Sequence, residues 1–380
     1  MHYKTLQHQP NGLSLPPMHE INLRITGPTP LAPSVREAMS QQMVSHRSDE
    51  FKSMYAAVDR DVRALLGTRH PALFMTCSGT GGLEAAVQNV LQPGDKVLSL
   101  HTGFYGELFA QITERWLQAS EQLIRLQSPP GESVDFHLLT QLLQHQHFDA
   151  VLITHNESST GVLNPLEDLV RIVKAHSDAL ILCDAISSAG TTPIQMDRWG
   201  VDVLITVPQK GLMAPPGLAI VIANDRAQER SINKRVSLYF DFQRALSSAR
   251  QYQTPSTPSI SVFRGLQASL QLLFVEGLDK VYERHAQART LCQNALMEME
   301  LDSFAKAPFQ SPGVTAISLP EHINAQSLQL ALEQNYNLFT TPAAGHWQNK
   351  VLRLAHMGWF SVEDIDRALS CLKDHMRKIH

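Results

Sequence analysis

The sequence predicts an α/β fold, in which a mainly parallel sheet is flanked by helices and a smaller α+β domain follows. Two observations support this fold class. As far as about residue 224, short apolar runs alternate with helix-period segments, which is typical of crossover connections in a parallel sheet. The chain also has 380 residues, more than one hydrophobic core usually supports, so two domains are expected.

The first 22 residues are polar and contain Pro10, Pro16 and Pro17, so we expect an extended N-terminal arm over residues 1–22. A large domain is expected over residues 23–260. Its strands are expected at residues 72–76, 96–100, 150–154, 180–183, 203–207 and 218–222, with helices at residues 82–90, 106–116, 138–145 and 165–175.

A Pro/Ser/Thr segment at residues 251–259 predicts a connector to a small C-terminal domain over residues 261–380. A helical pattern at 261–299, interrupted near Gly277, opens this domain. A strand at 314–319, a helix at 325–334, a strand at 351–354 and a helix at 362–376 follow. Ser361, with Glu363 and Asp364 behind it, is typical of a helix N-terminus.

Composition and charge are those of a soluble globular protein. Hydrophobic residues make up 43% and charged residues 18% of the chain, and the net charge of −4 gives no basic footprint for nucleic acid. No apolar stretch is long enough to cross a membrane, and the N-terminus has no apolar signal core. The four cysteines form no CxxC motif and are expected to be reduced thiols. A cytoplasmic enzyme without nucleic-acid or membrane partners is expected.

Asp184 and Lys210 each follow a buried-looking strand. Ligands of parallel sheets collect at the carboxyl ends of strands, so both side chains are expected at one edge. A carboxylate and an amine suit pyridoxal phosphate, whose aldehyde needs a lysine for a Schiff base and whose ring nitrogen needs an acidic partner. Taken singly, Lys210 is more often a solvated loop lysine and Asp184 a helix cap.

Ser78, Gly79 and Thr80 lie in a Gly-rich segment that follows a strand and opens a helix. Free backbone N–H groups and hydroxyls at such a position favour a phosphate. The alternative is a simple turn with Ser78 as the helix N-cap. Because the segment lacks both the P-loop ending and the GxGxxG spacing, it suits a small phosphate monoester better than a nucleotide.

Three further signals also lie at strand ends or inside a strand. Tyr105, between two glycines, could stack on a flat ring, although a partly buried loop tyrosine is the commoner use. The polar loop 155–161 could bind a phenolic oxygen and a substrate; a metal site is disfavoured there because no HExxH motif or second histidine at ligand spacing occurs. Arg353, between apolar residues, suits a carboxylate; the alternatives are a structural salt bridge or an outward-facing strand residue.

Together these signals occur in the order of a fold type I pyridoxal-phosphate enzyme. Over about residues 23–375 the chain resembles the class V aminotransferase family, in its alanine–glyoxylate, serine–glyoxylate and serine–pyruvate group. The segments that carry the resemblance are Thr-Gly-Pro-Thr-Pro (26–30), Ser-Gly-Thr-Gly (78–81), Pro-Gly-Asp (93–95), His-Asn-Glu-Ser-Ser-Thr-Gly (155–161), Asp-Ala-Ile-Ser-Ser (184–188), Met-Asp (196–197), Gln-Lys (209–210), Pro-Pro-Gly (215–217) and Leu-Arg-Leu (352–354).

The resemblance implies a fold type I transferase with a mainly parallel seven-stranded sheet and pyridoxal 5′-phosphate as cofactor. It also implies a role for each matching residue. Lys210 would form the internal aldimine and move the proton, Asp184 would pair with the pyridine N–H, Tyr105 would stack on the ring, Ser158 would approach the phenolic oxygen, and Ser78, Gly79, Thr80 and Gln209 would hold the phosphate.

For the substrate, the resemblance implies that Arg353 binds the α-carboxylate and that Gly27 and Pro28 line a small pocket. The reaction would move an amino group from an amino acid of the alanine or serine type to glyoxylate or pyruvate by a ping-pong aldimine/ketimine mechanism. Thr257 resembles a residue that binds the phosphate of the neighbouring subunit, which implies a homodimer with shared sites. Thr254 stands where some relatives have a tyrosine.

One departure from the family pattern is Val207, where relatives often have a small residue. Two alternatives stay open. A cysteine desulfurase-like lyase would need a reactive cysteine on a mobile loop and histidines at the positions of Tyr105 and Gln209. A non-catalytic protein of the same fold would be expected to lack the lysine, aspartate or arginine, and all three are present. The amino donor, the acceptor and the roles of His356, Met357 and Trp359 are left open by the sequence.

Overall fold

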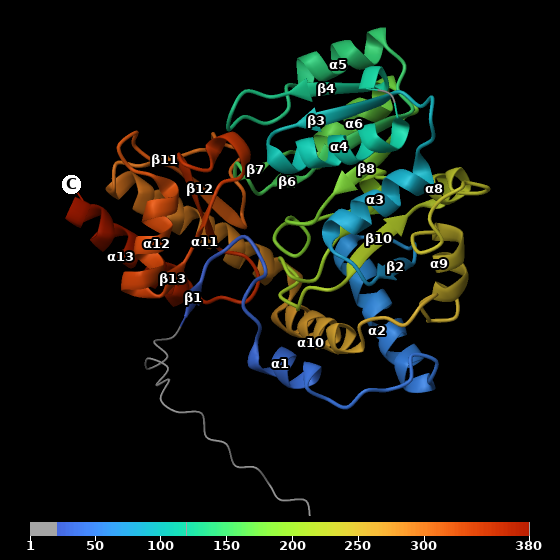
Figure 1. Cartoon of the computed structure of the whole chain (residues 1–380), viewed down its shortest axis with the longest axis horizontal. Helices are drawn as coiled ribbons and strands as arrows, with labels where there is room; N and C mark the ends of the chain where they lie inside the picture. The colour runs from blue at the N-terminus through green and yellow to red at the C-terminus, as the bar shows by residue number, and fades with distance from the viewer. Residues whose placement is uncertain (1–20, 119, 380) are drawn as a thin grey trace, which may run out of the picture.

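The computed structural model describes residues 21–118 and 120–379, so most of the predicted N-terminal arm lies outside the described residues. A large α/β part and a smaller α+β part lie side by side (Figure 1). Their buried side chains form two main hydrophobic clusters, one within residues 51–281 and one within residues 288–376. The division into domains at residues 23–260 and 261–380 stays a prediction.

The large part is built on a seven-stranded sheet with the strand order β2-β10-β9-β8-β5-β3-β4. Only β10 runs antiparallel to its neighbours, which confirms the predicted mainly parallel sheet. The strands are β2 (Ala72–Met75), β3 (Val97–His101), β4 (Leu123–Gln127), β5 (Ala150–Thr154), β8 (Leu180–Asp184), β9 (Val203–Thr206) and β10 (Ala219–Ala223). Among these, β4 has no counterpart in the sequence-based expectations, because this edge strand is only partly buried and contains Arg125.

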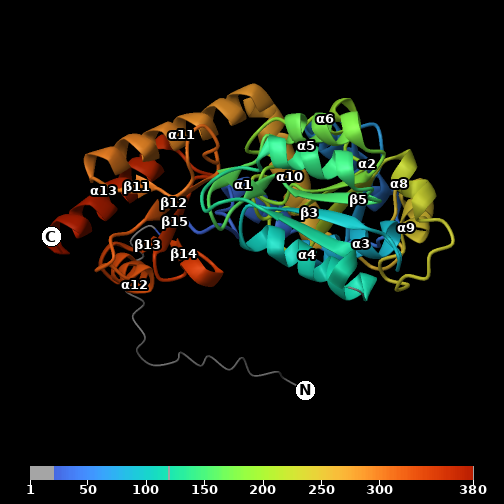
Figure 2. The ribbon, with the colours of Figure 1, turned by 90° about the horizontal axis from the view of Figure 1, so that it is seen from above.

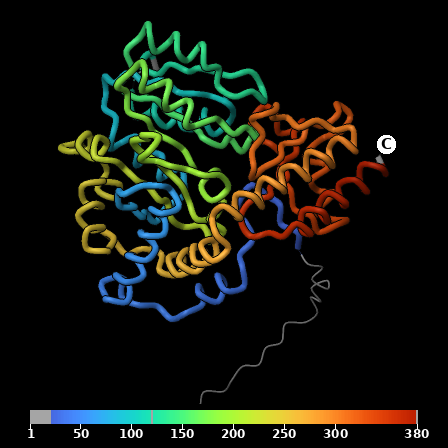
Figure 3. Tube along the Cα trace, turned by 180° about the vertical axis from the view of Figure 1, so that it is seen from behind, coloured from blue at the N-terminus to red at the C-terminus, as the bar shows by residue number. Residues whose placement is uncertain are grey.

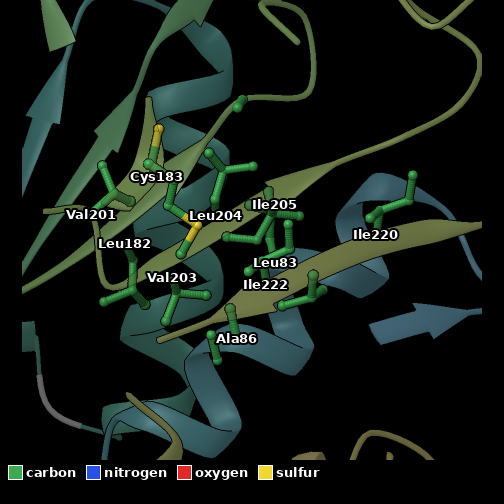
Figure 4. Close-up of a cluster of buried hydrophobic side chains, with 14 of the residues drawn as sticks. Leu83, Ala86, Leu182, Cys183, Val201, Val203, Leu204, Ile205, Ile220 and Ile222 are labelled. Atoms are coloured by element: carbon green, nitrogen blue, oxygen red, sulfur yellow. The ribbon is translucent and has the colours of Figure 1, made fainter. Parts of the chain in front are cut away.

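Helices cover both faces of this sheet (Figure 2). One face carries α3 (Gly79–Val90) and α4 (Phe104–Leu117), and the other carries α5 (Phe136–His145) and α6 (Leu166–His176). In the core, Leu83 of α3 lies among Ile205, Ile220 and Ile222 of the adjacent strands (Figure 4). A Cβ atom at Gly82 would lie 2.9 Å from the Ile205 Cγ2 atom, so glycine allows this close helix–sheet approach.

A further layer of helices packs beside β2. It contains α1 (Pro33–Met39), α2 (Asp49–Leu66) and α10 (Ile260–Glu276). Phe263 of α10 contacts Phe51 of α2 and Phe74 of β2, with ring centroids 5.3 and 5.0 Å apart. The sequence-based expectations leave α2 out, although its buried residues recur at helical spacing. The helical pattern at 261–299 is interrupted at Gly277 as predicted, and α11 (Leu278–Glu298) follows.

The small part contains an antiparallel sheet with the order β11-β12-β15-β14, and α11 runs from the large part along it (Figure 3). Its elements are β11 (Asp302–Ser303), β12 (Val314–Ser318), α12 (Ala325–Tyr336), β13 (Leu338–Phe339), β14 (Thr341–Pro342), β15 (Val351–Ala355) and α13 (Val362–Ile379). The Ser361 hydroxyl accepts a hydrogen bond from the Asp364 N–H at 3.2 Å, which confirms the predicted helix start. β1 (Asn22–Leu23) pairs with β13, so the chain passes from the small part toward the large sheet.

The remaining elements are short. They are the hairpin of β6 (Asn156–Glu157) and β7 (Val162–Leu163), the helices α7 (Met196–Trp199), α8 (Asp225–Arg230) and α9 (Phe242–Ala249), and two 3-10 turns at Ser120–Gln122 and Gly345–Trp347. In the described part of the chain, no helix combines the length and the apolar character that a membrane span requires.

The strand order creates a natural ligand position. After β3 the chain adds β4 on one side, and β5 then pairs on the opposite side of β3. The chain direction through the sheet therefore reverses between β3 and β5, and ligands of open α/β sheets bind at the carboxyl ends of strands at such a switch point. Tyr105 follows β3, the 155–161 loop follows β5, and Asp184 ends β8, so these segments meet at this edge.

Phe263→Ala is expected to lower the free energy of unfolding by about 3–5 kcal/mol, because it leaves a cavity among three aromatic rings. Chemical denaturation of the purified variant measures this change. Phe274→Ala, on the same helix at a side chain that is 37% exposed, is the control and is expected to change stability by less than about 1 kcal/mol. Equal losses in the two variants would contradict this packing.

Candidate active site

A cavity of about 270 Å³ opens at the carboxyl edge of the large sheet. Nine residues that the sequence predicts for the site line it: Gly27, Pro28, Ser78, Gly79, Thr80, Tyr105, Asp184, Gln209 and Lys210. They come from the N-terminal segment and from the loops after β2, β3, β8 and β9. The fold therefore brings together residues that are as far apart as 183 positions in the sequence (27 to 210).

Lys210 lies in the turn after β9, and its Nζ atom donates a hydrogen bond to the Thr26 carbonyl. Burial lowers the pKa of Lys210 to about 8, helped by the nearby Arg353 cation and opposed by the Asp184 and Glu157 carboxylates. Gly27 has a φ of +103°, and a Cβ atom there would lie 2.8 Å from the Lys210 Cδ atom. Glycine at this position therefore leaves room for the lysine side chain.

Asp184 is the last residue of β8, and its Oδ1 atom accepts a hydrogen bond of 2.8 Å from the Ile186 N–H. Burial raises the pKa of Asp184 to about 7, against the effects of this hydrogen bond and of Lys210. An adjacent positive charge would stabilise the ionised form of this buried carboxyl group and lower its pKa. A protonated ring nitrogen supplies that charge.

The segment around Ser78 forms the N-terminus of α3. Ser78 is the N-cap residue of α3, as the alternative interpretation expected, but its side chain makes no capping hydrogen bond. A Cβ atom at Gly79 would lie 2.7 Å from the Ile186 Cδ1 atom and 3.1 Å from the Val207 Cγ1 atom. Val207, the departure from the family pattern, thus fills the space directly beneath this loop. The free N–H groups of the helix start suit an anion.

Two cavity-lining side chains carry buried polar atoms without a partner among the described residues. These atoms are the Asn156 Oδ1 and the Gln209 Oε1. Buried polar groups are nearly always hydrogen-bonded, so such atoms point to a missing ligand. With an acid, a lysine and a helix N-terminus around the same cavity, the residues present fit pyridoxal phosphate.

Glu157 is a buried residue of the polar 155–161 loop. From the sequence it is singled out only with His155 as a possible metal ligand, an interpretation that the spacing disfavours. Its Oε2 atom accepts hydrogen bonds of 2.9 Å from the N–H groups of Tyr105 and Gly106. Burial raises the pKa of Glu157, against the effect of its hydrogen bonds. The signal that could have identified it is an acidic residue in a segment otherwise composed of hydroxyl residues, placed directly behind a buried strand.

Arg353 lies in the middle of β15 with only 4% of its surface exposed. Its guanidinium donates hydrogen bonds to the carbonyls of Pro342 and Ser158, and within residues 21–118 and 120–379 no carboxylate forms an ion pair with it. Burial lowers the pKa of Arg353, while the Tyr105 hydroxyl and Glu157 oppose this effect. Within the described part of the chain, Arg353 therefore forms no structural salt bridge and its guanidinium has no anionic partner.

Some predicted residues lie outside the cavity lining. Ser158 and Arg353 are buried but do not line it, and Thr257 is exposed in a separate pocket that also contains Thr254 and Tyr239. The Thr254 hydroxyl donates to the Ser256 carbonyl at 2.7 Å. For the residues left open, His356 and Met357 are buried and Trp359 is 42% exposed, and none of the three lines the cavity.

The cysteines do not have the character of a desulfurase nucleophile. Burial raises the pKa of each of the four thiols, most strongly for Cys183, whereas a reactive cysteine requires a lowered pKa. Within the described residues, no group of three or more histidine, cysteine or acidic side chains could hold a metal ion.

The fold and site define a pyridoxal-phosphate enzyme, and comparisons with known proteins give the family. The family model for class V aminotransferases matches residues 23–361. The small subunit of a soluble hydrogenase from Synechococcus sp. (strain PCC 6716) is 31% identical over 92% of this chain and 91% of that protein. The serine–glyoxylate aminotransferase of Hyphomicrobium methylovorum is 32% identical over 92% of this chain and 87% of that protein.

Solved structures agree with these sequence relatives. The crystal structure of alanine–glyoxylate aminotransferase from Nostoc sp. has a TM-score of 0.88 and 25% identity, and the alignment covers 97% of each chain. The chain belongs to the class V aminotransferase family. It is a transaminase with the fold of type I pyridoxal-phosphate enzymes, and its cofactor is pyridoxal phosphate.

When bound, pyridoxal phosphate supplies an electron sink for the charge that develops at the substrate Cα atom. The chain's own groups would control protons and charge around it. Lys210, with a pKa of about 8, can accept and return a proton near neutral pH. Asp184 would keep the ring nitrogen protonated, and the start of α3 would hold the phosphate.

In the cofactor-free protein, Lys210 is expected to react with a small amine-directed reagent with a pH midpoint near 8, because burial favours its neutral form. Asp184→Asn is expected to shift this midpoint to lower pH, since it removes a carboxylate that favours the ammonium form. Mass spectrometry of the peptide that contains Lys210 measures the rate at each pH. A midpoint near that of a free lysine, about 10.4, would contradict the buried environment.

Proposed function

We propose that this transaminase moves an amino group from a small amino acid of the alanine or serine type to a small 2-oxo acid, glyoxylate or pyruvate. The observation that carries the proposal is the buried Arg353 guanidinium, which has no carboxylate partner in the described chain. A planar guanidinium binds a carboxylate through two parallel hydrogen bonds. The serine–glyoxylate and alanine–glyoxylate names of two relatives support this substrate class.

The proposed roles follow the positions of the side chains. Lys210 is the catalytic lysine, Asp184 pairs with the ring nitrogen, and Tyr105 stacks on the ring. Ser78, Gly79, Thr80 and Gln209 bind the phosphate, Ser158 binds the phenolic oxygen, and Gly27 lines the substrate pocket. The cavity lining supports all of these assignments except that of Ser158, which is buried and does not line the cavity.

The proposal includes a homodimer in the cytoplasm, with a large domain at residues 23–260 and a small domain at residues 261–380. Thr257 is exposed and lies away from the cavity of its own chain, which is consistent with a contact to the phosphate of a second subunit. A shared site of this kind requires a symmetric interface that contains Thr257. Mixing of inactive Lys210→Ala and Thr257→Ala subunits should restore part of the activity only if sites are shared.

Lys210→Ala is expected to lower turnover by at least about 10²–10⁴-fold, because it removes the group that transfers the proton. Conversion of the bound cofactor by single turnover with alanine or serine, followed by absorbance, measures the loss. Lys52→Ala is the control, since Lys52 lies in an exposed ion pair with Asp49. Turnover that survives in Lys210→Ala would refute the role of this lysine.

Arg353→Gln is expected to lower kcat/KM for every amino donor by about 10- to 100-fold, because a charged hydrogen-bond partner of the substrate carboxylate is lost. The exposed Arg171, which pairs with Asp168, provides the matched Arg→Gln control. Steady-state kinetics with a panel of amino acids against glyoxylate and pyruvate measures the effect and identifies the donor. An unchanged kcat/KM for Arg353→Gln would exclude carboxylate binding at this residue.

A further inference from the structure

The Glu157 side chain is completely buried, and each of its two carboxylate oxygens accepts two hydrogen bonds. The Oε2 atom accepts from the Tyr105 and Gly106 N–H groups at 2.9 Å each. The Oε1 atom accepts from the Ser159 N–H at 3.0 Å and from the Ser159 hydroxyl at 2.6 Å. Three of these four contacts come from N–H groups, which can only donate, so the geometry favours the ionised carboxylate.

The contacts of Glu157 join two loops of the site. Ser159 extends the link, because its Oγ atom accepts a hydrogen bond of 2.9 Å from the Phe104 N–H. A Cβ atom at Gly103 would lie 2.5 Å from both the Glu157 Cγ and the Ser159 Oγ atoms. Glycine is therefore required for this close approach. We call Glu157, Ser159 and the three N–H groups of residues 104–106 the Glu157 clamp.

The clamp holds residues that face the cofactor and the substrate. Tyr105, fixed through its N–H, lines the cavity, and so does Asn156, which precedes Glu157. On the other side, Ser158 presents its carbonyl to the Arg353 guanidinium at 3.1 Å. One carboxylate thus fixes the backbone beneath the stacking ring and the backbone that supports the arginine.

The negative charge of Glu157 also affects the protonation of neighbouring groups. Two buried cations, Lys210 and Arg353, and two buried acids, Asp184 and Glu157, influence the ionisation of one another. The Glu157 carboxylate favours the protonated form of both cations and opposes ionisation of Asp184. Loss of this anion would leave two cations facing the single carboxylate of Asp184.

We propose that Glu157 is a positioning residue for the reaction: its ionised carboxylate fixes the Tyr105 and Ser158 backbones and provides the fixed counter-charge for Lys210 and Arg353. The residue acts through the clamp and does not line the cavity. The inference rests on the proposed function, because it assigns to the Glu157 clamp an effect on the groups that bind cofactor and substrate.

Three variants separate the effect of the Glu157 charge from the effect of the clamp geometry. Glu157→Gln removes the charge and turns an amide NH₂ toward N–H donors. Gly103→Ala keeps the charge but displaces the clamp, and φ at this position is 167°, which is extended backbone open to alanine. Glu107→Gln is the matched control, since it removes one charge from the first turn of α4, at a partly buried ion pair with Arg125 that is not part of the clamp.

The first measurement is the affinity of the cofactor-free full-length protein for pyridoxal phosphate, followed by absorbance and by thermal unfolding. We expect Glu157→Gln to weaken binding about 10- to 100-fold, the range for a lost charged hydrogen bond, and Gly103→Ala to weaken it as well. Glu107→Gln should stay within about twofold of the wild type. The second measurement is the pH midpoint of the visible absorption of the bound cofactor.

In Glu157→Gln this midpoint should move to lower pH by about one unit, because an anion that favours the protonated lysine nitrogen is lost. In Gly103→Ala, which keeps the anion, it should move far less. Wild-type affinity and midpoint in Glu157→Gln, with or without a lower unfolding temperature, would overturn the proposal. A wild-type protein that binds no pyridoxal phosphate would overturn the proposed function, and this inference with it.

Discussion

The burial of charge at one edge of the sheet is the constraint on which the rest of the site depends. Removal from water disfavours the charged form of every ionisable group, and here it brings the pKa of Lys210 to about 8 and that of Asp184 to about 7. Such groups stay in place only if main-chain donors and acceptors replace the lost water. Carbonyls serve Lys210 and Arg353, while N–H groups serve Asp184 and Glu157.

The N-terminal segment connects the two parts of the molecule at this site. The Arg24 carbonyl accepts a hydrogen bond from the Ala355 N–H at the end of β15, and two residues later the Thr26 carbonyl accepts from Lys210. The Thr29 hydroxyl then donates to the Lys210 carbonyl at 3.2 Å. The strand that carries Arg353 and the turn that carries Lys210 are therefore held by the same short stretch of chain.

Relatives of about 30% identity to this chain carry different names. Most contacts that hold the buried charges are made by backbone groups, which many side-chain substitutions leave unchanged. Under the proposed function, specificity for a donor would depend instead on the few side chains around Arg353 and the Gly27 segment. Members of the family can therefore keep the backbone contacts that hold the buried charges while their substrate pockets differ.

The sequence by itself determined the mainly parallel sheet, the helix start at Ser361 and the residues that meet at the cavity, because apolar periodicity and polar residues at strand ends are local signals. It left out α2 and the edge strand β4, and it treated Glu157 only as a metal ligand. Tertiary structure alone decided that the Arg353 guanidinium has no carboxylate partner in the described chain and that Glu157 fixes the Tyr105 loop. Both depend on contacts between residues about 50 to 200 positions apart, which no local pattern specifies.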